Sequence, residues 1–197
     1  MAQILSAPDP ITGPLAAIPR TGDKQVVVKN ARTNSVAHLT RYWLMKSEPN
    51  ECSIDDAMKA PKHTVPWTGV RNYQARNFMR DAMQIGDGVL FYHSSCPEPG
   101  IAGIARVAST TRPDPTQFDP RSPYFDAASK LDTPRWLLLD VQAVRKTRLL
   151  GLPELRATAA LADLVLLRRG NRLSITPVEA AHWRLIADQM LAPAPRR

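Results

Sequence analysis

The sequence predicts an α+β fold in which a small mixed sheet, barrel-like or strongly curved, is flanked by short helices. Three observations support this prediction. Apolar strand-like segments alternate with short helical ones, these elements show no regular β-α-β rhythm, and the aromatic residues mark one continuous region. All twelve Trp, Tyr and Phe residues lie between Tyr42 and Trp183. A chain of this length suits one domain, which buries about 70% of its unfolded surface.

The two ends of the chain differ from this central region. Residues 1–40 contain four prolines and no aromatic residue. Such a segment has little apolar surface to offset its ordering entropy, so we expect a disordered N-terminal extension. Within it, 25–29 (Gln-Val-Val-Val-Lys) is a candidate edge strand. We expect the domain over residues 41–191 and a basic tail over 192–197.

Net charge and cysteine usage narrow the class of protein. The chain carries 26 Lys+Arg against 18 Asp+Glu, a net charge of +8, which fits a polyanionic partner. No apolar run reaches the roughly 18 residues of a membrane span, so no membrane partner is expected. Two cysteines cannot form a disulfide framework, and the proline-interrupted start lacks a secretory pattern. We expect a reduced, cytoplasmic monomer.

The first elements follow from local patterns. Tyr42–Lys46 is a short strand with both faces apolar, as expected of a buried strand. Ser53 with Asp56 has the pattern of a helix N-cap and opens a short helix. Apolar residues in 74–83 follow the i, i+3, i+4, i+7 spacing of one helix face. Further strands are expected at 89–93 and 100–108.

The second half begins with a long loop. Residues 109–134 carry five prolines, and a loop of this length in a domain is usually functional or disordered. We expect a strand at 136–144, mostly helix at 152–167 and a strand at 172–175. In the last helix, Thr176 is the expected N-cap, Pro177 the first helical residue and Glu179 the third.

Side chains that serve metals or catalysis are scattered. His93 and Cys96 have an i, i+3 spacing, but no second pair completes a tetrahedral zinc site. Asp114, Asp119 and Asp126 could bind Mg²⁺, but the first two precede prolines, which favours turn capping. The sequence contains no Gly-x-Ser-x-Gly elbow and no glycine-rich phosphate loop. We therefore expect no metal, no cofactor and no catalytic residue.

One segment, 65–76, concentrates residue types that hold an unstacked nucleobase. It contains Trp67, Asn72 and Tyr73 together with Arg71 and Arg76. Aromatic rings stack on bases, amides bond their edges, and guanidinium groups bind phosphates. The alternative is that Trp67 belongs to the core and the two arginines form a solvated face.

Several blocks occur in a characteristic order, and together they closely resemble the EVE domain family. The resemblance covers about residues 41–190. It is carried by 42–49 (Tyr-Trp-Leu-Met-Lys-Ser-Glu-Pro), 67–77, 91–95, 100–105, 114–120, 134–136 and 172–174.

This resemblance implies a PUA-like fold and a non-catalytic reader of nucleic acid. Members of the family are thought to take a flipped, modified base into a pocket. The expected base is a 5-modified cytosine, and the expected nucleic acid is DNA rather than RNA. The expected pocket residues are Lys46, Ser47, Trp67, Asn72, Tyr73, His93, Ser94 and Ser174. The expected phosphate-binding residues are Arg71, Arg76, Arg168, Arg169 and Arg172.

Some alternatives stay open. His93 can be a satisfied core histidine, and Arg168 and Arg169 can form a solvated helix end. An enzyme acting on a modified base or RNA would use Cys96 or the loop carboxylates of Asp114 and Asp119. A third possibility is a module that binds a small nucleotide-like ligand in the same cleft.

Overall fold

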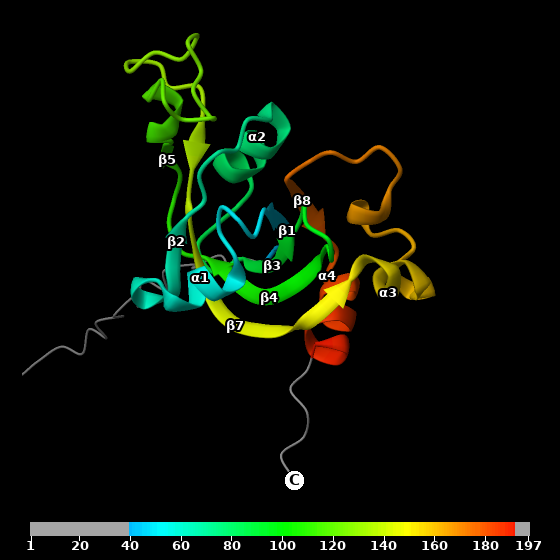
Figure 1. The fold of residues 1–197 in the computed structure, drawn as a ribbon. Helices are drawn as coiled ribbons and strands as arrows, with labels where there is room; N and C mark the ends of the chain where they lie inside the picture. The colour runs from blue at the N-terminus through cyan, green and yellow to red at the C-terminus, as the bar shows by residue number, and fades with distance from the viewer. Residues whose placement is uncertain (1–39, 192–197) are drawn as a thin grey trace, which may run out of the picture. The chain divides into compact units, whose positions relative to one another are not determined.

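The computed structural model describes residues 40–191 (Figure 1). The expectations for the N-terminal extension, for the candidate strand at 25–29 and for the tail at 192–197 therefore lie outside the described residues. Within the described range, no helix is long and apolar enough to cross a membrane.

The described chain forms eight strands and four α-helices. The strands are β1 (Tyr42–Ser47), β2 (Thr64–Pro66), β3 (Gly88–His93), β4 (Gly100–Val107), β5 (Arg112–Pro113), β6 (Leu137–Leu138), β7 (Asp140–Gly151) and β8 (Ile175–Val178). The helices are α1 (Ile54–Lys59), α2 (Tyr73–Asp81), α3 (Leu152–Ala157) and α4 (Ala180–Trp183), the last continued by a π-helical segment, Arg184–Met190. Short 3-10 turns lie at Pro61–His63, Pro115–Phe118, Ala159–Leu161 and Val165–Leu167.

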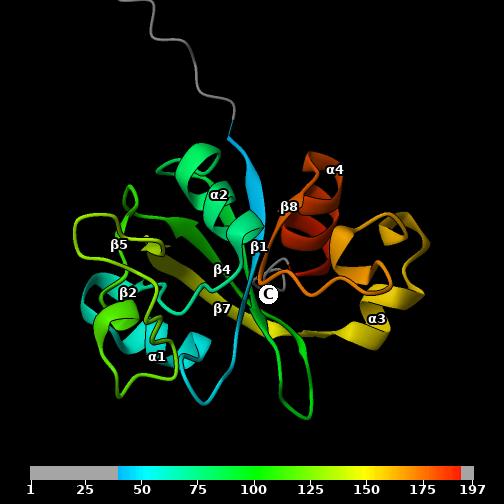
Figure 2. The same ribbon diagram turned by 90° about the horizontal axis from the view of Figure 1, so that it is seen from above.

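Six strands form one mixed, curved sheet in the order β2-β7-β4-β3-β1-β8 (Figure 2). Strands β1 and β3 are parallel, and every other pair of neighbours in this sheet is antiparallel. Strands β5 and β6 form a separate two-stranded ribbon. The predicted α+β class with a curved mixed sheet is confirmed. Because β1 and β3 are parallel, the loops after Ser47 and after His93 leave the sheet at the same end of the strands.

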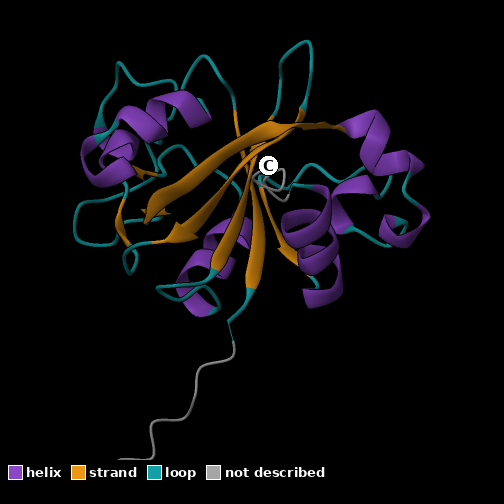
Figure 3. Ribbon diagram, turned by 90° about the horizontal axis from the view of Figure 1, so that it is seen from below, coloured by secondary structure: helices purple, strands orange, loops and turns teal. Residues whose placement is uncertain are grey.

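The two faces of the sheet carry separate apolar cores, and β1 shows why. Its residues alternate, so Trp43 packs on one face and Leu44 on the other. Helices α1 and α2 cover the first face, and α3, α4 and the π-helical segment cover the second. Figure 3 shows these helices on both sides of the strands. A strand buried on both faces reads as a continuous apolar run, which the sequence of β1 has.

Side-chain caps begin the first two helices where the sequence places them. The Ser53 hydroxyl accepts from the Asp56 amide, and the Asp56 carboxylate accepts from the Ser53 amide, which completes a capping box for α1. The Asn72 side chain accepts from the amides of Gln74 and Ala75 at the start of α2.

The expected strand at 172–175 and the last helix need correction. Strand β8 covers Ile175–Val178, and the helix begins only at Ala180. Thr176 is therefore a buried strand residue opposite Leu44 rather than an N-cap. The free edge of β1 needs a partner for its backbone groups, which outweighs the local capping pattern. Pro177 is tolerated because β8 lies at the edge of the sheet.

Two other boundaries differ from the expected ones. The strand expected at 136–144 is split into β6 and a long β7 that continues to Gly151. The segment 152–167 forms only one helical turn and a half, α3, followed by two 3-10 turns. Pro153 lies in the first turn of α3, where proline is favoured. Beyond α3, the burial of Leu155, Leu161 and Leu164 in one apolar core determines the path of the chain.

Candidate functional site

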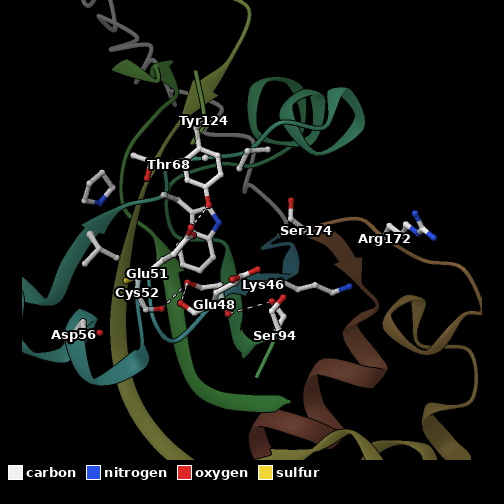
Figure 4. A pocket seen from close by; sticks show the side chains of 17 residues that line it. Lys46, Glu48, Glu51, Cys52, Asp56, Thr68, Ser94, Tyr124, Arg172 and Ser174 are labelled. Atoms are coloured by element: carbon white, nitrogen blue, oxygen red, sulfur yellow. Dashed lines mark hydrogen bonds between the residues drawn. The ribbon is translucent and has the colours of Figure 1, made fainter. Parts of the chain in front are cut away.

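A cavity of about 660 Å³ lies beyond the C-terminal ends of the neighbouring strands β1 and β3 (Figure 4). Lys46 and Ser47 come from the end of β1, and Ser94 follows β3. The backbone holds these segments together, because the Ser94 amide donates to the Ser47 carbonyl at 2.9 Å and the Lys46 amide donates to the Ser174 carbonyl at 2.8 Å. The segment after β2 and the loop at Tyr124 complete the walls.

Trp67 belongs to this cavity and to the core at the same time. Its residue is only 6% exposed, and its ring meets Phe91 edge to face at 5.1 Å between centroids. Its backbone amide donates to the Leu139 carbonyl at 2.8 Å, which continues the pairing of β2 beyond Pro66. Within the described residues its indole N–H has no hydrogen-bond partner, although Trp67 also lines the cavity. The indole is therefore a rigid wall with a free donor.

Gly69 is the point at which the loop 109–134 approaches the cavity. Its φ is +78°, a conformation that favours glycine, and an added Cβ would lie 2.7 Å from the Tyr124 ring. The Gly69 amide donates to the Asp114 carboxylate at 2.9 Å. The glycine thus admits an aromatic side chain of the protein itself against the backbone of the cavity wall.

Arg71 fixes that loop in place. Its guanidinium donates to the Asp114 carboxylate at 2.9 Å, to the Thr116 hydroxyl at 2.8 Å and to the Tyr124 carbonyl at 2.8 Å. It also lies against the rings of Tyr124 and Trp136, at 5.5 and 5.6 Å. Asp114 is completely buried; burial raises the pKa of its carboxyl, but the hydrogen bonds from Arg71, Thr116 and Gly69 outweigh this and hold the pKa below its usual value. The expected phosphate contact of Arg71 is replaced by a structural role, because its donors are already engaged.

One side of the cavity is acidic. Glu48 and Glu51 line it, and the Tyr124 hydroxyl donates a short hydrogen bond to Glu51 Oε1 (Figure 4). Burial, with the hydrogen bond to Glu51 and the charges of both glutamates, raises the pKa of Tyr124 to about 12. At neutral pH this phenol is therefore protonated and can only donate to the carboxylate.

The other side of the cavity is basic. Lys46 is half-buried, and burial lowers the pKa of its ammonium group. Arg172 also lines the cavity, and in Figure 4 the Lys46 side chain extends toward it. A second groove of about 440 Å³ shares Lys46 with the cavity and adds Arg156, Arg168 and Arg169. Within the described range, none of these five cations has a carboxylate within ion-pair distance.

Three of the expected pocket residues lie elsewhere. Asn72 caps α2, and Tyr73 is 52% exposed and packs on Trp136 at 4.9 Å between ring centroids. His93 accepts from the Ile54 amide through Nε2 at 3.0 Å, which holds the start of α1. Burial lowers the pKa of His93. Arg76, an expected phosphate ligand, instead donates to the Arg135 carbonyl at 3.0 Å. The reason is similar in each case, because Asn72 and His93 bind the first amides of a helix, and Tyr73 and Arg76 contact residues 135–136, which follow the long loop.

Five expected residues do line the cavity, and three expected arginines lie free at its rim or in the groove. The cavity holds Lys46, Ser47, Trp67, Ser94 and Ser174, and the free arginines are Arg168, Arg169 and Arg172. The lining residues that were not anticipated include Glu48, Glu51, Asp56 and Tyr124. Glu48 stands in the Ser-Glu-Pro block that carries the resemblance, and Tyr124 is one of three aromatic residues in the long loop. No cluster of three potential metal ligands occurs among the residues the structure describes.

The family model of the EVE domain matches residues 41–189. The chain belongs to the EVE domain family. Human thymocyte nuclear protein 1 is 42% identical over 180 residues, which cover 82% of this chain and 79% of that protein. A Pseudomonas syringae protein of solved structure superimposes with a TM-score of 0.72 at 48% identity, covering 76% of this chain and 99% of that one.

The human relative has also been crystallised with a ligand. The human THYN1 protein in complex with 5-methylcytosine-containing DNA superimposes on this chain with a TM-score of 0.71. The two are 41% identical, and the match covers 76% of this chain and 96% of that one. The expected family and PUA-like fold are thus confirmed, and the relative's complex provides the ligand class to compare with the cavity.

Proposed function

We propose that this EVE domain binds nucleic acid without catalysis and holds one unstacked, modified base, a 5-modified cytosine in DNA, in the cavity at the end of β1 and β3. The observation that carries the proposal is that a 41% identical relative has been crystallised in complex with 5-methylcytosine-containing DNA. The cavity, which is walled by Trp67 and polar side chains, supports it. The expected site residues that line the cavity keep their proposed roles.

The size and lining of the cavity suit a single base with its sugar. Sites for small molecules span about 300–1,000 Å³, and this cavity has about 660 Å³. Extruding a base costs a few kcal/mol, and stacking on an aromatic ring returns about 1–3 kcal/mol. A charge-assisted hydrogen bond from the Lys46 ammonium group adds to this at the base edge.

The adjoining groove is the proposed path of the sugar–phosphate backbone. Lys46 belongs to both the cavity and the groove, so a strand whose base enters the cavity leaves it beside Arg168 and Arg169. Arg172 lies at the same side of the cavity. Phosphate contacts of this kind supply affinity that is independent of sequence and falls steeply with salt.

A reader is favoured over an enzyme by the roles of the side chains considered for catalysis. Asp114 is enclosed by Gly69, Arg71 and Thr116, and Asp119 pairs with Arg121. Cys96 does not line the cavity. The cavity therefore supports recognition through stacking, charge and hydrogen bonds.

Titration with matched oligonucleotides tests the proposal. The wild-type protein should bind DNA with one 5-methylcytosine more tightly than the same DNA with cytosine, at low and at moderate salt. Alanine substitution of Arg168, Arg169 and Arg172 together should weaken both ligands alike and lower the salt slope by up to about three, roughly one per phosphate contact.

Arg184→Ala is the matched control, because Arg184 is exposed and lines neither the cavity nor the groove. It should leave affinity and salt slope unchanged. Equal binding of methylated and unmethylated DNA by the wild-type protein would contradict the proposal.

A further inference from the structure

The acidic side of the cavity has a chemical consequence for which base it accepts. Glu51 is held by the Tyr124 hydroxyl through Oε1, which leaves Oε2 as an acceptor at the cavity. Tyr124 is itself fixed, because its backbone carbonyl accepts two hydrogen bonds from the Arg71 guanidinium and its ring lies on Gly69. Glu51 is thus a positioned carboxylate rather than a mobile surface charge.

The opposite side of the cavity offers a donor. The ammonium group of Lys46 lines the space and has no carboxylate partner within the described residues. A ligand that spans the cavity therefore meets an acceptor at Glu51 and a donor, the Lys46 ammonium group, across from it (Figure 4). The cavity therefore has a hydrogen-bond acceptor on one side and a hydrogen-bond donor on the other.

The pyrimidine bases differ at the matching edge. Cytosine presents a 4-amino donor beside the acceptors N3 and O2, whereas thymine presents a 4-keto acceptor beside an N3–H donor. Carboxylates accept from the cytosine amino group, and they repel a keto oxygen at the same place. The methyl group at C5 is common to 5-methylcytosine and thymine, so only this edge distinguishes the two.

We propose that Glu51 is the specificity-determining residue of the cavity: it accepts a hydrogen bond from the 4-amino group of the base and so selects amino-pyrimidines over keto-pyrimidines. This inference rests on the proposed function and assigns its base-edge reader. A site built to bond a polar group rejects an analogue that lacks it far better than a hydrophobic pocket rejects an added methyl.

The test compares single-stranded oligonucleotides that are identical except for one 5-methylcytosine or one thymine. Single strands remove the cost of base pairing, which differs between the two. Wild-type protein should bind the 5-methylcytosine strand about tenfold more tightly, the fold-change expected of one well-placed base contact. Glu51→Gln should bring this ratio close to one, because an amide can also donate to the keto group.

Glu48→Gln is the matched control, because Glu48 lines the same cavity and loses the same charge but accepts no hydrogen bond from Tyr124. It should retain the ratio of the wild-type protein. A ratio that falls in Glu48→Gln and stays in Glu51→Gln would overturn the assignment.

A third strand, with unmodified cytosine, separates the two claims. The protein could prefer 5-methylcytosine over cytosine and yet bind 5-methylcytosine and thymine equally. That result would overturn the assignment of Glu51 to the 4-amino group and leave the proposed function standing. Equal, weak binding of all three strands would overturn both. Circular dichroism of each variant shows whether it folds, and the exposed position of both glutamates predicts that it does.

Discussion

At the scale of single residues, Trp67 combines two roles that sequence patterns treat as alternatives. Its side chain is 6% exposed and packs on Phe91, yet it also lines the cavity. The wall of the cavity is therefore a face of the core, held rigid by the packing behind it. Such a wall loses little entropy when a base stacks on it.

Replacement of Trp67 by alanine should destabilise the domain by about 3–5 kcal/mol, because a large buried ring leaves a cavity. Urea denaturation measures the loss. Tyr73→Ala is the control: Tyr73 is 52% exposed, and its loss should cost about 1 kcal/mol, the value of its contact with Trp136. A stable Trp67→Ala protein would show that the ring lies on the surface of the fold rather than in it.

Lys46 illustrates a charge kept at some expense to stability. Burial lowers the pKa of its ammonium group below the usual 10.5. The unfolded chain therefore binds more protons than the folded one between the lowered value and 10.5, and stability rises with pH in that window. Below it, the desolvation penalty is present in full.

Lys46→Met should accordingly be more stable than the wild-type protein at pH 7, with the difference shrinking as the pH approaches 10.5. The same variant should bind 5-methylcytosine DNA about tenfold more weakly, because a charge-assisted hydrogen bond is lost. Thermal melts at several pH values and a binding titration are compared on one preparation. A less stable variant with unchanged binding would assign Lys46 a structural role.

The sequence predicts cavity residues correctly where a side chain lies at the end of a strand. It fails where the side chain instead binds a helix end or another side chain. Lys46 and Ser47 reach the cavity because β1 stops there. Asn72 and Arg71 have residue types that suit a base or a phosphate, but one caps α2 and the other binds Asp114. Glu51 was missed because its meaning depends on Tyr124, a partner that is distant in sequence.

At the scale of elements, the long loop 109–134 is an ordered wall rather than a free segment. It is tied to the segment after β2 by Arg71 and to β6 by Gln117, whose side chain donates to the Trp136 carbonyl and accepts from the Trp136 amide at 2.9 Å each. Two of its aspartates cap local turns: Asp114 accepts from the Thr116 amide and Asp119 from the Arg121 amide. The turn-capping interpretation of these carboxylates is confirmed.

Arg71→Ala should cost about 3 kcal/mol of stability, because it leaves the buried Asp114 carboxylate without its cation. It should also speed proteolytic cleavage within 115–134. Arg112→Ala removes a partly exposed ion pair to Asp140 at the start of the same loop and should cost less than about 1 kcal/mol. If Arg71→Ala kept full stability but lowered the salt slope of DNA binding, the arginine would be a phosphate ligand after all.

Elements with a strong period were predicted well, and those set by tertiary pairing were not. The stripe of α2 and the capping box of α1 are local, so both helices were confirmed within a few residues. The sequence at Thr176 has an equally good local pattern for a helix start, but these residues pair with β1 as strand β8. A local pattern contains no information on whether a distant strand needs a partner.

At the scale of the whole described domain, the curvature of the sheet and its parallel pair determine where function gathers. Two cores occupy the two faces of the sheet, and the proposed base site lies beyond the ends of β1 and β3. The basic groove adjoins the same end of these strands through Lys46. Composition predicted a polyanionic partner from a net charge of +8, but only the fold shows that free cations and the cavity share one side.

The central claim is that a base enters the cavity beside Trp67, and the indole N–H signals of the tryptophans report on it directly. In the described domain, Trp43 donates to Asp87 and Trp136 to Asp126, whereas the Trp67 indole has no partner. In a 1H-15N correlation spectrum, assigned with Trp67→Phe, addition of an oligonucleotide with one 5-methylcytosine should shift the Trp67 signal strongly and leave those of Trp43 and Trp136 in place. A Trp67 signal that stays unchanged at saturating DNA would contradict the claim.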